Sequence, residues 1–170
     1  MGYIPCQMTE VVCRNAIARA LTEHYGVHWH NDEHFRSVLP KRLRCELENA
    51  VQLHQQHQGG SADRVAGALT FGFWVHLLTK GFDFILWKGG MTGCFPGAPA
   101  GIARVDIHRR LDRVRMFRNR IAHHDAVFDR QPTSEHGNIV QTVGFVCPEA
   151  QWLLARLSRV PRVINARPRL

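Results

Sequence analysis

The order of apolar and polar residues predicts helices along nearly the whole chain. Apolar residues recur three and four positions apart, and short polar or glycine-containing segments separate these repeats. Thr9 is expected to cap a helix that runs to about Tyr25, where a glycine ends it. A short helix is expected to begin near Asn31, and a longer one follows Pro40 and ends in the polar run at 54–61. The longer helix has one apolar stripe, made of Leu43, Leu47, Ala50 and Val51.

The middle of the chain combines a helix with a long irregular connection. Ser61 is expected to cap a helix that ends at Gly81. The apolar residues of this helix are four positions apart, at Val65, Leu69, Phe73 and Leu77. The segment 82–101 holds five glycines and two prolines, which predicts a loop with one helical turn around Leu86. Loops of this length in small domains often carry function.

The helix that follows Ile102 has an arginine in its apolar stripe. The stripe repeats at i, i+4, i+7, i+11 and i+14, which are Ile107, Leu111, Val114, Arg118 and Ile121. Burying an unpaired charge costs free energy. We therefore expect Arg118 either to have a partner in a cleft or to lie where the helix opens to an interface.

Two further helices are expected near 135–145 and after Pro148, a favourable first helical residue. The segment 139–146 is the one candidate strand, and it fits a helix about as well. These elements predict an all-α bundle without internal repeats, and the length of 170 residues predicts a single domain over 1–170.

Charge is concentrated in one of the predicted helices. The formal net charge is +8, and residues 102–124 hold seven arginines against two aspartates, a local charge of +5. Such a field favours a polyanionic partner, RNA or DNA before an anionic membrane, although a solvated helix face explains it about as well. If nucleic acid binds, the expected contacts on this helix are Arg110, Arg113, Arg115 and Arg120.

Cysteine use and hydropathy bear on the compartment. Five cysteines at irregular spacings, without a C-x-x-C pair, favour reduced thiols and a cytoplasmic protein. The N-terminus lacks a signal-peptide pattern. The longest uncharged apolar run, 65–79, is about 15 residues, which is too short to span a bilayer, so no membrane partner is expected.

No cofactor or metal ion is expected from the remaining motifs. The histidines of "VHWHNDEH" could bind zinc, but a helix that begins at Asn31 leaves His30 outside it. Surface histidines beside a packed Trp29 are favoured instead, and "FGFWVHLL" at 71–78 is expected to be core. The chain has no glycine-rich phosphate loop of known spacing and no paired carboxylates at a helical spacing.

The segment "RNRIAHHD" at 118–125 is the strongest candidate for chemistry. An arginine and a later histidine with four to six residues between them occur four times in the chain, which chance explains. Requiring asparagine directly after the arginine leaves only the pairs that begin at Arg118. A guanidinium can grip a phosphate and stabilise transition-state charge, and an imidazole with a pKa near ~6.5 can take or give a proton. These roles fit cleavage of RNA without a metal ion.

The expected roles are Arg118 for phosphate, His123 for proton transfer and Asn119 for holding His123 in one tautomer. His124 and Asp125 are neighbours without an assigned role. Arg118 and His123 are about 140° apart on an ideal helix. They converge on one phosphate if the helix ends or bends between them; alternatively they meet partners from a second subunit.

Four segments together resemble the Abi-like (abortive infection) proteins of bacteria. The resemblance covers roughly residues 20–168. It is carried by "LTFGFWVHLL" (69–78), "LWKGGMTGCFPG" (86–97), "VRMFRNRIAHHDAVFDR" (114–130) and "VCPEAQWLLARLSRVPRVINARP" (146–168).

The resemblance implies a member of the HEPN superfamily, a helical bundle with an up-and-down core, extra helices and one long Gly/Pro-rich loop. It implies a homodimer whose Arg-x4-6-His motifs face each other, and a metal-independent endoribonuclease that leaves 2′,3′-cyclic phosphate ends. Such proteins act in phage defence or as toxins, with an RNA or protein antitoxin. Carried over to this chain, the motif is Arg118, Asn119 and His123, with His124 and Asp125 adjacent. The alternatives are a non-catalytic RNA-binding module and a purely structural interaction protein.

Overall fold

The computed structural model describes residues 3–55, 61–88, 91–125, 127 and 131–166, and all regular secondary structure within them is helical. The predicted all-α class is therefore confirmed, and segment 139–146 is helix, not strand. No helix in these ranges has the length and apolar character needed to cross a membrane.

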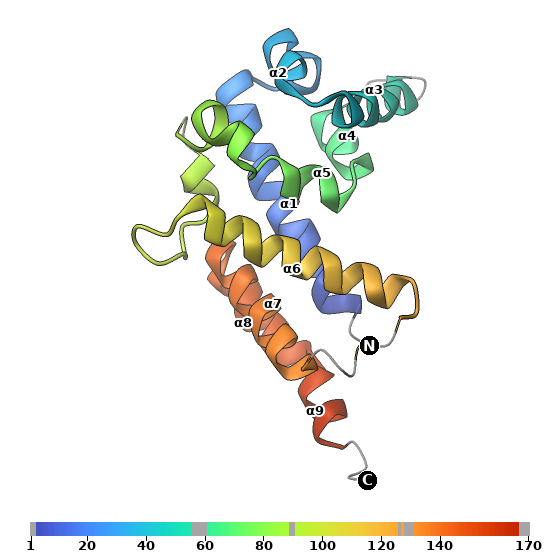
Figure 1. The fold of residues 1–170 in the computed structure, drawn as a ribbon, viewed down its shortest axis with the longest axis vertical. Coiled ribbons are helices and arrows are strands. Elements are labelled where there is room, and N and C mark those ends of the chain that lie inside the picture. The colour runs from blue at the N-terminus through green and yellow to red at the C-terminus, as the bar shows by residue number, and fades with distance from the viewer. Residues whose placement is uncertain (1–2, 56–60, 89–90, 126, 128–130, 167–170) are drawn as a thin grey trace.

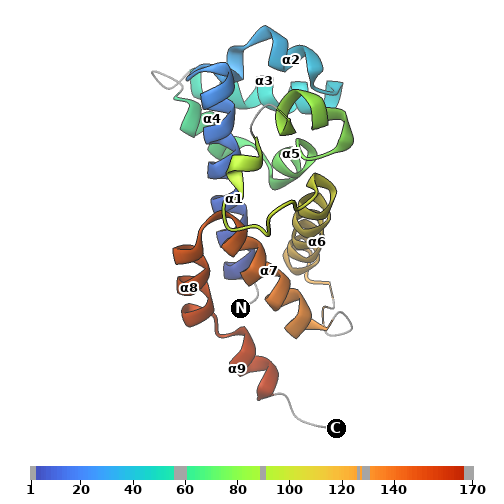
Figure 2. The ribbon, with the colours of Figure 1, turned by 90° about the vertical axis from the view of Figure 1, so that its left-hand side faces the viewer.

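The longest described helix, α1 (Tyr3–Tyr25), is central, and α4, α5, α6, α7 and α8 all contact it (Figure 1). Figure 2 shows α2 to α5 around its C-terminal half, and α7 to α9 near its N-terminal half. The predicted cap at Thr9 is wrong, because α1 begins about two turns earlier and Thr9 is buried within it. The Thr9 hydroxyl donates to the Pro5 carbonyl oxygen at 3.0 Å. A buried Cys6 extends the apolar face toward the N-terminus, since a free cysteine packs like a small apolar residue.

Short elements connect α1 to the long helix α3 (Lys41–Gln55). Asn31 does not cap the next helix, since it ends the 3₁₀ turn η1 (Trp29–Asn31). The cap of α2 (Glu33–Val38) is Asp32, whose Oδ1 accepts from the Phe35 N–H at 2.7 Å. Helix α3 begins directly after Pro40, as predicted, and its expected apolar stripe is buried. The end of its polar run, 56–60, lies outside the described residues.

The single helix expected after Ser61 is two helices, α4 (Ala62–Ala68) and α5 (Phe71–His76). Ser61 does cap the first. The second is capped by Thr70, whose Oγ1 accepts from the Phe73 N–H at 3.3 Å. Glu46 of α3 accepts from both the N–H and the hydroxyl of Thr70, at 2.9 and 2.8 Å. The break is therefore fixed by a residue far away in the sequence. The apolar face is nevertheless buried as expected, at Val65, Leu69, Phe73, Trp74 and Leu77.

The predicted loop at 82–101 holds more helical turns than expected. It follows the 3₁₀ turn η2 (Lys80–Phe82) and contains the π-helical turn η3 (Asp83–Trp87) and the 3₁₀ turn η4 (Met91–Cys94). The turn expected around Leu86 is present, and Leu86 is buried; residues 89–90 lie outside the described ranges. Cys94 and Phe95 are also buried, so hydrophobic packing anchors this connection to the core.

In the described residues after the basic helix α6 (Arg104–Ala122), there are three helices where two were expected. They are α7 (Pro132–Val146), α8 (Pro148–Leu157) and α9 (Val160–Asn165). Helix α9 was missed because its six residues are too few for a periodic pattern, although Pro161 marks its first turn. The connection before α6 meets the end of α7, where the Gly97 N–H donates to the Phe145 carbonyl oxygen at 2.9 Å.

Replacing Gly97 with alanine is expected to lower the free energy of unfolding by about 1–3 kcal/mol. A Cβ at this position would overlap the Gly144 carbonyl oxygen. This oxygen belongs to the backbone of α7, so it cannot move aside as the end of a flexible side chain can. Gly137 is the matched control, because it lies within α7 with open space around it. Alanine there is expected to stabilise the helix by about 0.5–1 kcal/mol. Chemical denaturation measures both values, and equal effects of the two variants would contradict the close approach at Gly97.

Candidate functional site at the end of α6

Helix α6 carries the basic motif, and its apolar stripe is buried as predicted. Ile107, Leu111 and Val114 are at most 1% exposed. Arg118 continues this stripe with its side chain 30% exposed. It has a partner from another element, because Arg118 Nε lies 3.7 Å from Glu10 Oε2 of α1. Arg118 was expected either to have a partner or to lie at an interface, and the structure provides a partner within the chain.

Glu10 is the site residue that the sequence did not reveal. Its side chain is only 19% exposed, so its carboxylate meets Arg118 in a partly desolvated setting. A signal was present: Glu10 follows Cys6 by four positions and precedes Cys13 by three, and both cysteines are fully buried. An acidic residue at that spacing lies on the flank of a buried face. Such a residue is expected to need a cation.

A second carboxylate lies near this pair. Glu135 of α7 is 8% exposed and pairs with Arg113, with 2.9 Å between Glu135 Oε2 and Arg113 Nε. Burial raises the pKa of the Cys6 thiol to about 12; the Arg118 guanidinium opposes this, and the carboxylates of Glu135 and Glu10 add to it. Charges from α1, α6 and α7 therefore meet around Cys6, and its burial favours the neutral thiol.

Helix α6 ends at the histidine pair by a Schellman motif. The His124 N–H donates to the Ile121 carbonyl oxygen at 3.1 Å, and the Asp125 N–H donates to that of Arg120 at 2.9 Å. His124 has a φ of 59°, in the left-handed region. The side chains of His123, His124 and Asp125 are all exposed. The helix therefore stops before His123 and presents both imidazoles to solvent.

Replacing His124 with glycine is expected to raise the free energy of unfolding by about 0.5–1 kcal/mol. A left-handed φ strains a residue that has a Cβ, and glycine adopts it without that cost. Asp125→Gly is the matched control, because Asp125 is equally exposed and has no positive φ. It is expected not to stabilise the protein. Thermal unfolding of both variants measures the difference. A loss of stability in His124→Gly would contradict the proposed backbone strain at His124.

The expected contact between Asn119 and the His123 ring is not formed. Asn119 Oδ1 accepts instead from Arg118 Nη1 at 3.3 Å, and the His123 N–H donates to the Asn119 carbonyl oxygen at 2.9 Å. Asn119 and Glu10 therefore both contact the Arg118 guanidinium. The structure brings Arg118, Asn119 and Glu10 together and leaves His123 one turn further on, at the helix end.

The arginines expected to bind RNA mostly contact side chains of this chain. Arg110 donates to Asn138 and Gln141, and Arg115 pairs with Asp112 at 2.7 Å. Arg113 pairs with Glu135, as described above, and Arg120 is half-buried. Part of the +5 charge of this segment is therefore offset by nearby carboxylates. Contact of these arginines with RNA remains a prediction.

The histidines near the end of α1 form part of the packing. Trp29 is fully buried, as expected, but His30 is only 3% exposed, so the expectation of a surface histidine is wrong there. The His30 ring meets the Trp29 ring edge to face at 5.7 Å, and burial lowers the pKa of His30. In the described part of the chain, no three His, Cys, Asp or Glu side chains are grouped to hold a metal ion. All five cysteines are free thiols.

Comparison of the chain with protein-family models, with curated proteins and with solved structures gives no match. A proposal for its function depends on the residues and the geometry at the end of α6.

Proposed function

We propose that the protein is an Abi-like endoribonuclease of the HEPN type, active as a homodimer in phage defence or as a toxin. It cleaves RNA without a metal ion. Arg118 binds the scissile phosphate and His123 transfers a proton. The observation that carries this proposal is the end of α6, where the Arg118 guanidinium, in contact with Glu10 and Asn119, precedes an exposed pair of imidazoles by five and six residues.

The arrangement suits a phosphate ester as substrate. Glu10 Oε2 lies 3.7 Å from Arg118 Nε and Asn119 Oδ1 accepts from Arg118 Nη1 at 3.3 Å, so these contacts restrict the guanidinium before a phosphate binds. His123 is the C-cap, and its N–H still donates to the Asn119 carbonyl oxygen, so it keeps the helical position about 140° from Arg118. The proposal therefore depends on the second copy in the homodimer to bring an arginine and a histidine to the same phosphate.

The proposed reaction is a transesterification. The ribose 2′-oxygen attacks phosphorus, and the bond from phosphorus to the 5′-oxygen breaks, which leaves a 2′,3′-cyclic phosphate. One imidazole takes the proton of the 2′-hydroxyl and another gives a proton to the departing 5′-oxygen. His123 supplies one of the two, and His123 of the second copy in the homodimer supplies the other. Arg118 stabilises the negative charge that grows on the phosphate oxygens.

The direct test is cleavage of a mixed RNA pool by the purified protein in excess EDTA. New RNA ends that carry 2′,3′-cyclic phosphate are expected, and the same ends should appear in cells after brief induction. Sequencing of those ends gives the target as well as the activity. Intact RNA, or cleavage that needs added divalent metal, would overturn the proposal.

A non-catalytic RNA-binding module is the second candidate. The specific observation in its favour is the pairing of Arg118 with Glu10, since a carboxylate beside the guanidinium opposes a phosphate at the same place. This candidate predicts salt-dependent RNA binding without new RNA ends. Expression of the unaltered protein would then not arrest growth, and Arg118→Ala would not change the growth rate.

A further inference from the structure

A pocket lies between helices α1 and α4, in a part of the molecule that the proposed reaction does not use. Its volume is about 590 Å³, within the roughly 300–1,000 Å³ of small-molecule sites. Figure 2 shows α4 beside α1, and the two helices are in contact. None of the motif residues 118–125 lines this α1–α4 pocket.

The two walls of the α1–α4 pocket carry opposite charges that do not pair with each other. Arg14 and Arg19 lie on α1, and Asp63 lies in the first turn of α4. Within the described residues, none of these three side chains forms an ion pair. Arg14 Nε donates to Asn15 Oδ1 at 3.2 Å, which is a neutral acceptor. The pocket therefore offers a ligand positive charge on one wall and negative charge on the other.

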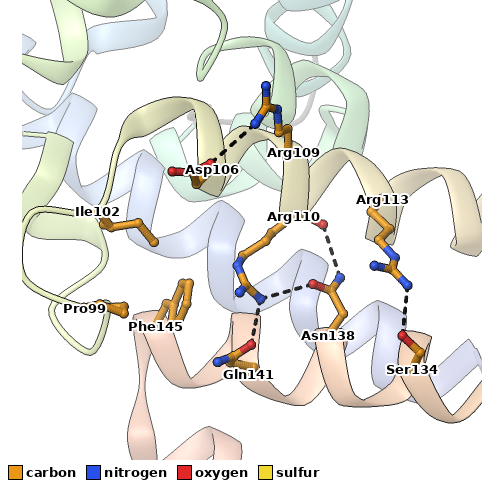
Figure 3. Close-up of a pocket in the computed structure, with 10 residues that line it drawn as sticks. All are labelled: Pro99, Ile102, Asp106, Arg109, Arg110, Arg113, Ser134, Asn138, Gln141 and Phe145. Carbon is orange, nitrogen blue, oxygen red and sulfur yellow. Dashed lines mark hydrogen bonds and ion pairs between the residues drawn. The ribbon is translucent and has the colours of Figure 1, made fainter.

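The pocket between α6 and α7 differs in this respect. There Arg110 donates to Asn138 and Gln141 of α7 (Figure 3). Arg109 and Arg113 each pair with a carboxylate. A ligand in that pocket would compete with contacts that already exist. In the α1–α4 pocket, a charged ligand would gain ion pairs without breaking any between described residues.

The inner end of the α1–α4 pocket combines an apolar surface with an unused donor. Trp29 lines the pocket with a fully buried side chain, and its Nε1–H group has no acceptor among the described residues. A buried N–H group without an acceptor costs free energy. The apolar lining is made of small side chains, those of Ala18, Ala62 and Ala66, which leave room between the helices. A ligand oxygen at this end would satisfy the indole, and an apolar group would fit against the alanines.

We infer that the α1–α4 pocket binds a free α-amino acid with an apolar side chain. The carboxylate contacts Arg14 and Arg19 and accepts from the Trp29 Nε1–H group, and the ammonium group contacts Asp63. The side chain packs on the three alanines. A simple anion would be repelled by Asp63 and a simple cation by the two arginines, whereas a zwitterion is attracted by both walls. The inference depends on neither RNA binding nor cleavage.

The test titrates phenylalanine and leucine separately into the protein and measures binding by calorimetry. At least one of them is expected to bind with a dissociation constant on the order of 1 mM or below. Hydrocinnamate and isocaproate are the same molecules without the ammonium group, and phenethylamine and isoamylamine are the same molecules without the carboxylate. Each analogue is expected to bind at least about tenfold more weakly than its amino acid, because it loses one charged contact.

Two variants remove one charge from each wall. Arg19→Gln and Asp63→Asn are each expected to weaken binding at least about tenfold. Arg64→Gln and Glu33→Gln are the matched controls. Arg64 is exposed on α4 outside the pocket, and Glu33, like Asp63, is an exposed acidic residue in the first turn of a helix. Both controls are expected to change binding by less than about twofold, and all four variants should keep the melting temperature of the parent protein.

The indole of Trp29 gives a second readout in the NMR spectrum of the nitrogen-15-labelled protein. Its N–H signal is expected to shift when the amino acid is added, because the indole gains an acceptor. The indole of Trp152 is 60% exposed on α8, so its signal is expected to stay unchanged.

Binding that is weakened by Arg19→Gln and Asp63→Asn, but not by the two controls, supports the site. Failure of both amino acids to bind at about 10 mM, or binding unchanged by the two variants, overturns it. Equal affinity for hydrocinnamate and phenylalanine, or for isocaproate and leucine, also overturns it, because the ligand is then a simple carboxylate. Since no RNA is present, failure of the nuclease proposal gives a different result.

Discussion

Replacing His123 with alanine is expected to lower the rate of RNA cleavage by about 100- to 10,000-fold. The variant loses a proton donor and acceptor that the end of α6 presents to solvent. The melting temperature should hardly change, because only the His123 backbone takes part in ending the helix. Single-turnover cleavage of labelled RNA measures the rate, and thermal unfolding checks the fold.

The chain contains its own control for this experiment. Arg19 and His24 have the same spacing as Arg118 and His123, and His24 is likewise exposed near the end of a helix. No asparagine follows Arg19. His24→Ala is therefore expected to leave cleavage unchanged. Equal rates for His123→Ala and the unaltered protein would remove His123 from the reaction.

Replacing Arg118 with lysine is expected to lower cleavage by about 100- to 1,000-fold. Lysine keeps the charge but cannot bind two phosphate oxygens with one planar group, and it cannot reproduce the contacts with Glu10 and Asn119 together. Arg19→Lys, at the matching position of α1, is expected to have no effect. The rate at saturating RNA is the informative measurement, since the proposed contact strengthens in the transition state.

A structural role of Arg118 can be separated from a chemical one. Arg118→Gln leaves the partly buried Glu10 without its cation, which should cost about 1–2 kcal/mol of stability. The double variant Glu10→Gln and Arg118→Gln removes both charges and should recover most of that stability. Cleavage should stay low in the double variant. If cleavage recovered together with stability in the double variant, Arg118 would only support the fold.

Local sequence patterns predicted the elements well where packing follows the helical repeat. The apolar stripe of α3 and the first three positions of the α6 stripe are buried as expected, because the repeat decides which face meets the core, while Ile121 is partly buried. Hydroxyl residues were harder to assign. Thr9 resembles a cap in sequence, but its hydroxyl bonds to the Pro5 carbonyl oxygen one turn earlier in the same helix. Thr70 is fixed as a cap by Glu46, 24 positions away in the sequence.

Part of the candidate site was predictable from the sequence. The sequence placed Arg118 on the buried side of α6 and required a partner, and the structure provides one. It could not identify Glu10, since 108 positions separate the two residues and only the packing of α1 against α6 joins them. The left-handed conformation of His124 was also hidden, because the usual glycine is absent from that position.

The way in which α6 ends has a consequence for the evolution of this protein. The hydrogen bonds that close the helix join backbone atoms, so the fold makes little demand on the side chains at His123 and Asp125. Mutations at these positions can therefore change the chemistry while the scaffold persists.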